Sequence, residues 1–160
     1  MPHFVPTTFI ATLFSIIGAT TLSASDLSVA QQFSRATSPA MKNGAVFMVV
    51  NNASDQDRKL VAAQTDVAKT AELHTHTMDD QGIMRMREVE GGIDVPAGMK
   101  NVLQPGGYHV MLMGLNGALK KGSVFDLTLT FDNGETLTVS VPVKSAGAMV
   151  PMSEMDNTLH

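Results

Sequence analysis

Residues 123–143 read SVFDLTLTFDNGETLTVSVPV and contain the clearest structural pattern in the chain. In the first half of this segment apolar and polar side chains alternate, which is typical of a strand with one buried face and one solvated face. Asn133-Gly134 then separates two such runs, and this dipeptide is the strongest short-range indication of a β-hairpin. The segment therefore predicts two antiparallel strands, Ser123–Phe131 and Glu135–Val143.

The chain before this hairpin repeats short apolar runs between turn residues and lacks a long 3.6-residue periodicity, which predicts an all-β protein. At 160 residues it is long enough for one domain with a core and too short for two. We expect residues 26–144 to form a two-sheet sandwich or a small Greek-key barrel. The other predicted strands are Leu27–Arg35, Gly44–Asn51, Arg58–Gln64, Lys69–His74, Ile83–Val89, Lys100–Leu103 and Tyr108–Gly114.

The two ends of the chain differ in composition from this domain. Residues 1–25 lack Asp, Glu, Lys and Arg, and the apolar run FIATLFSII is followed by small residues, which predicts a signal peptide cleaved near Ala24 or Ser25. A membrane-anchored N-terminus is the alternative, although about 20 apolar residues are needed to span a bilayer. After cleavage we expect no stable membrane span. Residues 145–160, SAGAMVPMSEMDNTLH, are expected to form a flexible tail.

The composition excludes several classes of function. A net charge of -4 and scattered Lys and Arg residues argue against a nucleic-acid partner. The absence of Cys removes disulfides, thiolate zinc sites, Cys nucleophiles and blue-copper centres with a Cys ligand. Twelve Met residues beside one Tyr and no Trp are more than core packing usually requires. A copper site in this chain would have to use Met and His.

The segment GGYHVMLMG, residues 106–114, offers such donors. In an extended strand His109, Met111 and Met113 lie on one face, so an imidazole and thioethers can converge on one ion. Thioether ligands favour Cu(I), and imidazole also suits copper. The alternative is a partly buried His beside a core Met, which is the commoner role of such a pair.

A second donor-rich segment is LHTHTMDDQGIMRM, residues 73–86. His74 and His76 share one parity with Met78, and the turn-like DDQG lets Met84 and Met86 fold back towards them. The structural alternative is that these Met residues are ordinary strand residues. Asp79, Asp80 and Glu72 are close enough in sequence to orient His74 or His76.

The order of these motifs resembles the periplasmic copper chaperones of the PCu(A)C type. The resemblance rests on SRAT at Arg35, GAVF at Gly44, ELHTHTM at Glu72, MRMREVEGG at Met84, PGGYHVMLMGL at Pro105 and LTLTF at Leu127, and so covers most of the expected domain. It implies a cupredoxin-like Greek-key β-sandwich or barrel and a protein that is not an enzyme.

The resemblance also implies one Cu(I) ion held by His74, Met86, His109 and Met111. Eleven residues separate His74 from Met86 and twenty-two separate Met86 from His109, one more than the family pattern in each gap. Gln81 and one of Gly91 and Gly92 are expected to be insertions in turns, which would leave the ligands in place. His76, Met84 and Met113 stay open as additional or replacement ligands, and the tail stays open as a Cu(II) site.

The expected function is that of a periplasmic chaperone that delivers copper for the assembly of cytochrome c oxidase copper centres. The resemblance implies a recipient that is an oxidase subunit or a Sco-type thiol protein. Two rivals are an exported enzyme with a metal held by His74, His76 and His109 near Asp79, and a structural β-sandwich without metal. The absence of a Gly-x-Ser-x-Gly motif and the Met beside each His argue against the enzyme.

Overall fold

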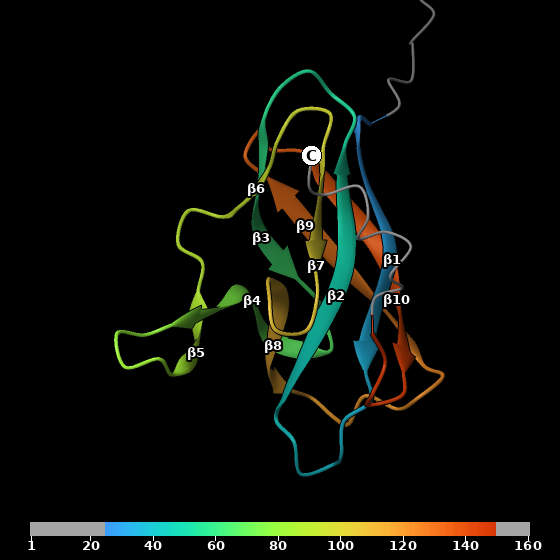
Figure 1. Cartoon of the computed structure of the whole chain (residues 1–160). Helices are drawn as coiled ribbons and strands as arrows, with labels where there is room; N and C mark the ends of the chain where they lie inside the picture. The colour runs from blue at the N-terminus through green and yellow to red at the C-terminus, as the bar shows by residue number, and fades with distance from the viewer. Residues whose placement is uncertain (1–24, 150–160) are drawn as a thin grey trace, which may run out of the picture.

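The computed structural model describes residues 25–149 of the chain (Figure 1). Nearly all of the expected signal peptide, and residues 150–160 of the expected tail, lie outside this range. No helix in the described range is long and apolar enough to cross a membrane. Ten strands make up the range: β1 (Leu27–Arg35), β2 (Asn43–Asn52), β3 (Arg58–Gln64), β4 (Ala68–Met78), β5 (Met84–Glu88), β6 (Ile93–Val95), β7 (Lys100–Leu103), β8 (His109–Leu115), β9 (Val124–Phe131) and β10 (Thr136–Lys144).

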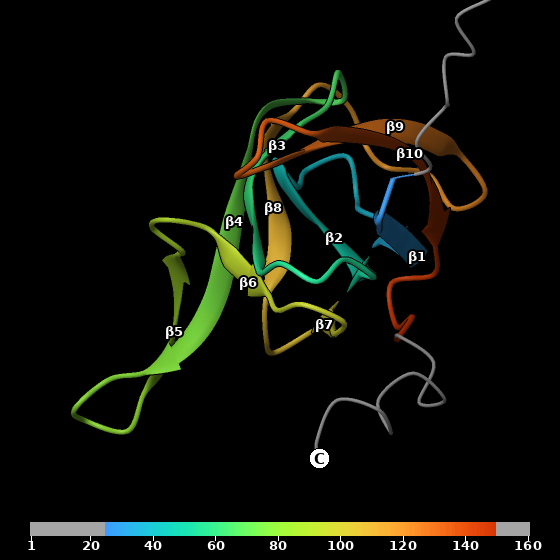
Figure 2. The same cartoon turned by 90° about the horizontal axis from the view of Figure 1, so that it is seen from above.

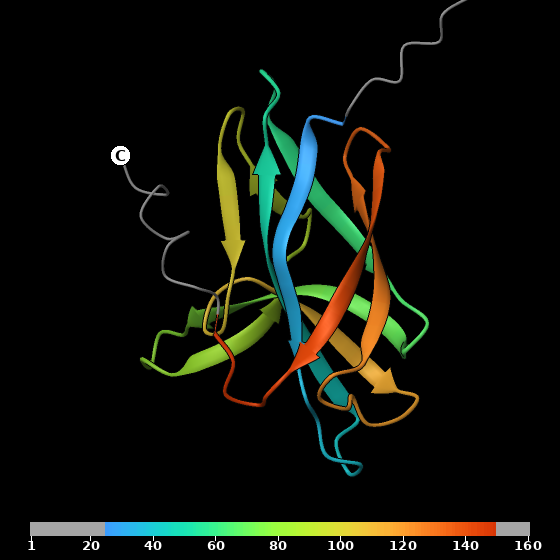
Figure 3. The same ribbon diagram turned by 90° about the vertical axis from the view of Figure 1, so that its right-hand side faces the viewer.

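Seven of these strands form a closed barrel in the order β4-β8-β2-β1-β10-β9-β3. The pairing of β3 with β4 closes the barrel at Ala63 and Ala71. β1 and β10 run parallel, side by side in Figure 3, and the other described pairs are antiparallel. The protein therefore has the all-β, cupredoxin-like fold that the sequence predicts.

Three short strands are added to the outside of the barrel. β5 pairs with β4, β6 with β3, and β7 with β2. Seen from above, the β4–β5 hairpin projects away from the barrel wall (Figure 2). This hairpin and the neighbouring strand β8 carry the residues of the predicted copper site.

The β9–β10 hairpin confirms the pattern from which the fold was predicted. Thr130 pairs with Thr136, and the intervening turn contains Gly134 with a φ of 82°. Every second residue of β9 is buried, from Phe125 to Phe131. These side chains enter the main core, which fills the interior of the barrel.

A second, smaller apolar cluster lies on the other face of β1 and β2. Phe33, Phe47 and Val49 form it, and Ala148 from the segment after β10 packs against it. β2 thus sends Val46 into the main core and Phe47 into the outer cluster, so it is covered on both faces. The outer cluster lies beside His109, one of the predicted copper ligands.

Candidate metal centre

Strand β4 lies between β5 and β8 and so brings the two donor-rich segments together. On one side His74 pairs with His109 of β8, and on the other side His76 pairs with Met86 of β5. Paired residues of antiparallel strands point to the same face of a sheet, as do residues two apart on one strand. His74, His76, Met86, His109 and Met111 therefore share one face.

His109 lies close enough to each of the other two imidazoles on this face for the pair to bind one ion. The ring centroids are 6.0 Å apart for His74 and His109, and 5.4 Å apart for His76 and His109. A nitrogen–metal bond of about 2 Å puts each ring centroid roughly 3 Å from the ion, so two rings bound to one ion have centroids about 5–6 Å apart. The observed separations match that range.

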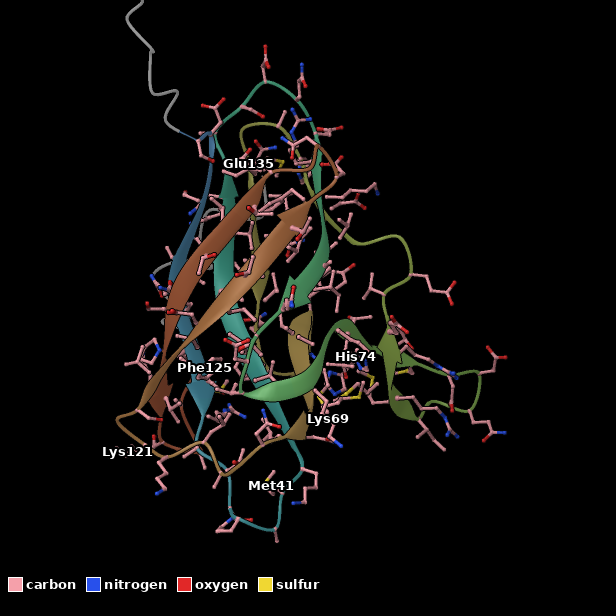
Figure 4. All side chains as sticks on the ribbon, turned by 180° about the vertical axis from the view of Figure 1, so that it is seen from behind. Met41, Lys69, His74, Lys121, Phe125 and Glu135 are labelled. Atoms are coloured by element: carbon pink, nitrogen blue, oxygen red, sulfur yellow. The ribbon has the colours of Figure 1, made fainter. Side chains whose placement is uncertain are left out.

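A groove of about 470 Å³ opens on this face. Its walls include His76, Met86, His109 and Met111, and it continues past Phe47 towards the end of β1. His74, Met84 and Met113 are not among its lining residues. Figure 4 shows sulfur atoms beside the labelled His74, at the base of the projecting hairpin. The groove gives the donor set an open side through which an ion can enter.

His109 is the most enclosed of the donors, with 2% of its surface exposed. Its Nδ1 atom lies 3.0 Å from the carbonyl oxygen of Gly107, and because a carbonyl only accepts, Nδ1 carries the proton and Nε2 has a free lone pair. Burial lowers the pKa of His109; the bond to Gly107 partly offsets this effect, and His76 and His74 add to it. The ring is therefore neutral at pH 7, as a metal ligand must be.

His74 is oriented by a carboxylate. Its Nε2 atom donates to Oε2 of Glu72 over 3.0 Å, which leaves Nδ1 with a free lone pair. Of the three carboxylates that the sequence left open, Glu72 is thus the one that contacts His74. Asp79 instead binds Arg85 and the backbone of its own turn.

The Nδ1 atoms of His74 and His76 are buried and have no hydrogen-bond partner in the part of the chain that the structure describes. Buried polar nitrogens are nearly always partnered, so two unpartnered ones on one face need an explanation. A soft metal ion held by His109 and by one of these two imidazoles would satisfy one of the lone pairs, and the thioethers of Met86 and Met111 would complete its shell. The residues present therefore fit copper.

Met84 and Met113, the other candidate ligands, lie farther along the strands from this group of donors. Met84 pairs with Met78 nearer the hairpin tip, and Met113 pairs with Thr70 and Asn43. Across residues 25–149, no group of three or more His, Asp or Glu side chains is arranged to hold a metal ion. The three-His centre of the rival enzyme is therefore not preformed among these residues.

The comparisons with known proteins agree with this architecture. The family model described as putative lipoprotein LpqE-like matches residues 27–143. The chain belongs to the LpqE-like family. A similar member is the putative lipoprotein Lxx21020 of Leifsonia xyli subsp. xyli, which is 38% identical over 115 residues, 71% of this chain and 69% of that protein. The uncharacterized protein RP573 of Rickettsia prowazekii is 27% identical over 103 residues, 64% of this chain and 56% of that protein.

Solved structures similar to this LpqE-like chain include PCuAC domains and the apo and CuI forms of DR1885. Apo-DR1885 from Deinococcus radiodurans is 32% identical with a TM-score of 0.59, and the match covers 92% of this chain and 100% of that one. The CuI-DR1885 structure is 34% identical with a TM-score of 0.57, covering 81% and 83%. The apo PCuAC domain from PmoF1, at 22% identity and a TM-score of 0.62 over 75% and 94%, shares the fold. The resemblance that the sequence predicts is confirmed.

The groove also includes residues that sequence reasoning did not place near the donors. Phe47 and Arg35 line it, and the guanidinium of Arg35 lies 5.3 Å from the centroid of the Phe47 ring. Arg35 belongs to β1 and Phe47 to β2, and because β2 pairs with both β1 and β8, it brings the two residues to the site. Their sequence segments, SRAT and GAVF, were part of the family resemblance, but no local pattern in them points to a metal.

Proposed function

We propose that this protein is an exported copper chaperone that holds one Cu(I) through His74, Met86, His109 and Met111 and passes it on by ligand exchange. The observation that carries the proposal is the meeting of the β4–β5 hairpin and β8 on one face, with two buried imidazole nitrogens that lack a hydrogen-bond partner within residues 25–149. The copper-bound state of the similar protein CuI-DR1885 supports it.

The donor set suits delivery of copper. Two imidazoles and two thioethers form a neutral, soft shell that favours Cu(I), and without thiolate the ion stays exchangeable in an oxidising compartment. His109 is buried in the barrel wall, whereas Met86 is 43% exposed on a strand with five exposed residues. Met86 is thus the donor that a recipient's ligand can displace first.

His76 is the alternative to His74 in this shell. It lines the groove, faces Met86 and has the shorter ring separation from His109. His74 retains the motif position and the orienting contact with Glu72. The alanine variants of the two residues separate these shells, because loss of the true ligand lowers Cu(I) affinity far more than loss of its neighbour.

The cellular role completes the proposal. The apolar N-terminal segment and the lipoprotein descriptions of the family and of a relative support export to the periplasm. By its resemblance to the PCu(A)C chaperones, the protein would supply copper for cytochrome c oxidase assembly, to an oxidase subunit or a Sco-type thiol protein.

X-ray absorption of the Cu(I)-loaded protein tests the site directly. We expect two sulfur and two nitrogen neighbours, with one sulfur lost in each of Met86→Ala and Met111→Ala. Tighter binding of Zn(II) than of Cu(I), unchanged in both Met variants, would instead favour a metalloenzyme. A His109→Ala protein that binds copper as the parent does would leave only a structural role.

A further inference from the structure

A second pair of thioethers lies farther out on the same hairpin. Met78, the last residue of β4, pairs directly with Met84, the first residue of β5. The next pair on the same face, towards the barrel, is His76 with Met86. Because the two pairs are two residues apart along both strands, they share one face and lie about 7 Å from each other.

Both methionines are unusually accessible. Met78 is 67% exposed and Met84 is 52% exposed, although each is a large apolar side chain. The hairpin that carries them stands away from the barrel (Figure 2). Packing of the core therefore gives no reason for Met at these two positions.

The turn beyond the pair holds the two strands in register. Asp79 accepts hydrogen bonds from the backbone of Gln81 and Ile83 through Oδ1, and from Arg85 through Oδ2 over 2.6 Å. Directly opposed residues in an antiparallel pair have Cβ atoms about 4.5–5.5 Å apart. Because metal–sulfur bonds are roughly 2.3 Å long, two flexible Met side chains at that spacing can coordinate one ion between them.

We propose that Met78 and Met84 form an outer thioether site for a soft monovalent ion, Cu(I) or Ag(I). This site lies two residues along the hairpin from the His76–Met86 pair of the inner site. This inference rests on the proposed function, because the outer pair would load or unload the inner shell. An ion held by the outer pair reaches His76 and Met86 by exchanging one donor at a time. The metal stays monovalent throughout, and no bond other than the coordinate ones forms or breaks.

The competing explanation is that the two methionines only stabilise the tip of the hairpin by apolar contact. Leucine preserves that contact, since a Met-to-Leu change conserves volume and hydrophobicity, but it removes the sulfur. The double variant Met78→Leu/Met84→Leu therefore separates the two roles. Met99→Leu is the matched control, because Met99 is 43% exposed in the turn between β6 and β7, away from the hairpin.

The experiment is a titration of the protein with Ag(I), a redox-inert probe, followed by NMR of ¹³C-labelled Met methyl groups. We expect the methyl signals of Met86 and Met111 to shift with the first equivalent and those of Met78 and Met84 with the second. The double Leu variant should take up only the first ion, whereas Met99→Leu should take up both. A Cu(I) titration of the parent should move the same four methyl groups.

The outer site is overturned if the signals of Met78 and Met84 stay fixed while the inner methyl groups respond, or if the second ion moves only the methionines of the tail. Loss of the second ion in Met99→Leu as well would mean unspecific thioether binding and would also overturn it. A failure of the proposed function looks different, because then the methyl groups of Met86 and Met111 would not respond to the first equivalent.

Discussion

The ring of Phe47 packs against the imidazole of His109, with centroids 6.2 Å apart. Phe47 also contacts Phe33 in the outer apolar cluster, with centroids 5.4 Å apart. His109 is therefore held in place by an aromatic wall, formed by the packed rings of Phe47 and Phe33. Met86, in contrast, lies on an exposed strand. One half of the proposed shell is rigid and the other half is accessible.

Replacing Phe47 with Ala should weaken both the fold and the site. Phe47 is 5% exposed, and truncation of a buried Phe typically costs about 3–5 kcal/mol of unfolding free energy. Urea denaturation of the apo protein measures this loss. Phe47→Leu should lose less, and its Cu(I) affinity should stay closer to that of the parent. Equal Cu(I) affinity in all three proteins would show that the aromatic wall does not position His109.

Glu72→Gln tests the orientation of His74. The amide keeps an oxygen that can accept the His74 hydrogen bond but removes the charge that makes His74 a stronger donor to the metal. We expect Cu(I) affinity to fall about tenfold, the lower end of what such supporting contacts contribute. Competition with a chromogenic Cu(I) chelator gives the number. Glu90→Gln, in the turn after β5, is the control, and an equal fall there would point to net charge instead.

The stability of the apo protein should depend on pH through His109. Its pKa is lowered in the folded state by burial, whereas in the unfolded chain it lies near 6.5. Below about pH 6.5 the unfolded state binds more protons than the folded state, so unfolding becomes easier until the pH falls below the folded pKa. Thermal denaturation at pH 7.5 and 5.5 should show a smaller loss in His109→Gln than in the parent. A parent curve that does not change with pH would contradict this assignment.

Affinity for copper should fall in the same direction. A proton and the metal compete for the same imidazole lone pair, so acidification below roughly pH 6.5 weakens Cu(I) binding through His ligands. Chelator competition at several pH values follows this. Flat affinity between pH 7 and 5 would mean that thioethers alone hold the ion.

The two glycines between β5 and β6 should tolerate substitution unequally. Both have positive φ, 82° for Gly91 and 92° for Gly92, so Ala at either position costs about 1–2 kcal/mol. A Cβ on Gly92 would also lie 2.6 Å from the carbonyl oxygen of Leu60, whereas Gly91 faces open space. Gly92→Ala should therefore be the less stable protein in urea denaturation. The reverse order would show that the contact with Leu60 relaxes freely.

The barrel strands could largely be predicted from sequence because their patterns are local. The alternation in β9 and the Asn133-Gly134 turn define a hairpin without any distant contact. β6 was missed because three residues between Gly92 and Pro96 are too few to show an alternation. β4 was predicted to end at His74 but continues to Met78, because its polar last residues are paired by β5 outside the barrel.

The sequence predicts which ligand residues share one face of a strand, but it does not predict which strands lie beside each other at the site. Strand periodicity alone puts His109 and Met111 on one face. The pairing of His74 with His109 joins residues 35 positions apart, and the approach of Phe47 follows from the pairing of β2 with β8. No local pattern encodes such registers. The positions expected to hold insertions, Gln81 and one of Gly91 and Gly92, lie in the connections on either side of β5, where an extra residue would lengthen a turn and leave the strands intact.

The segment that follows β10 has a practical consequence for anyone who shortens this protein. Arg35 donates to the carbonyl oxygen of Ala148 over 2.8 Å, and Ala148 covers part of the cluster formed by Phe33 and Phe47. An expression clone that stops at Lys144 would expose these rings to water next to His109. The truncated protein is expected to aggregate more readily, and its copper titration would not represent the site of the longer protein. A stop codon after Met149 keeps the contacts of Ala148.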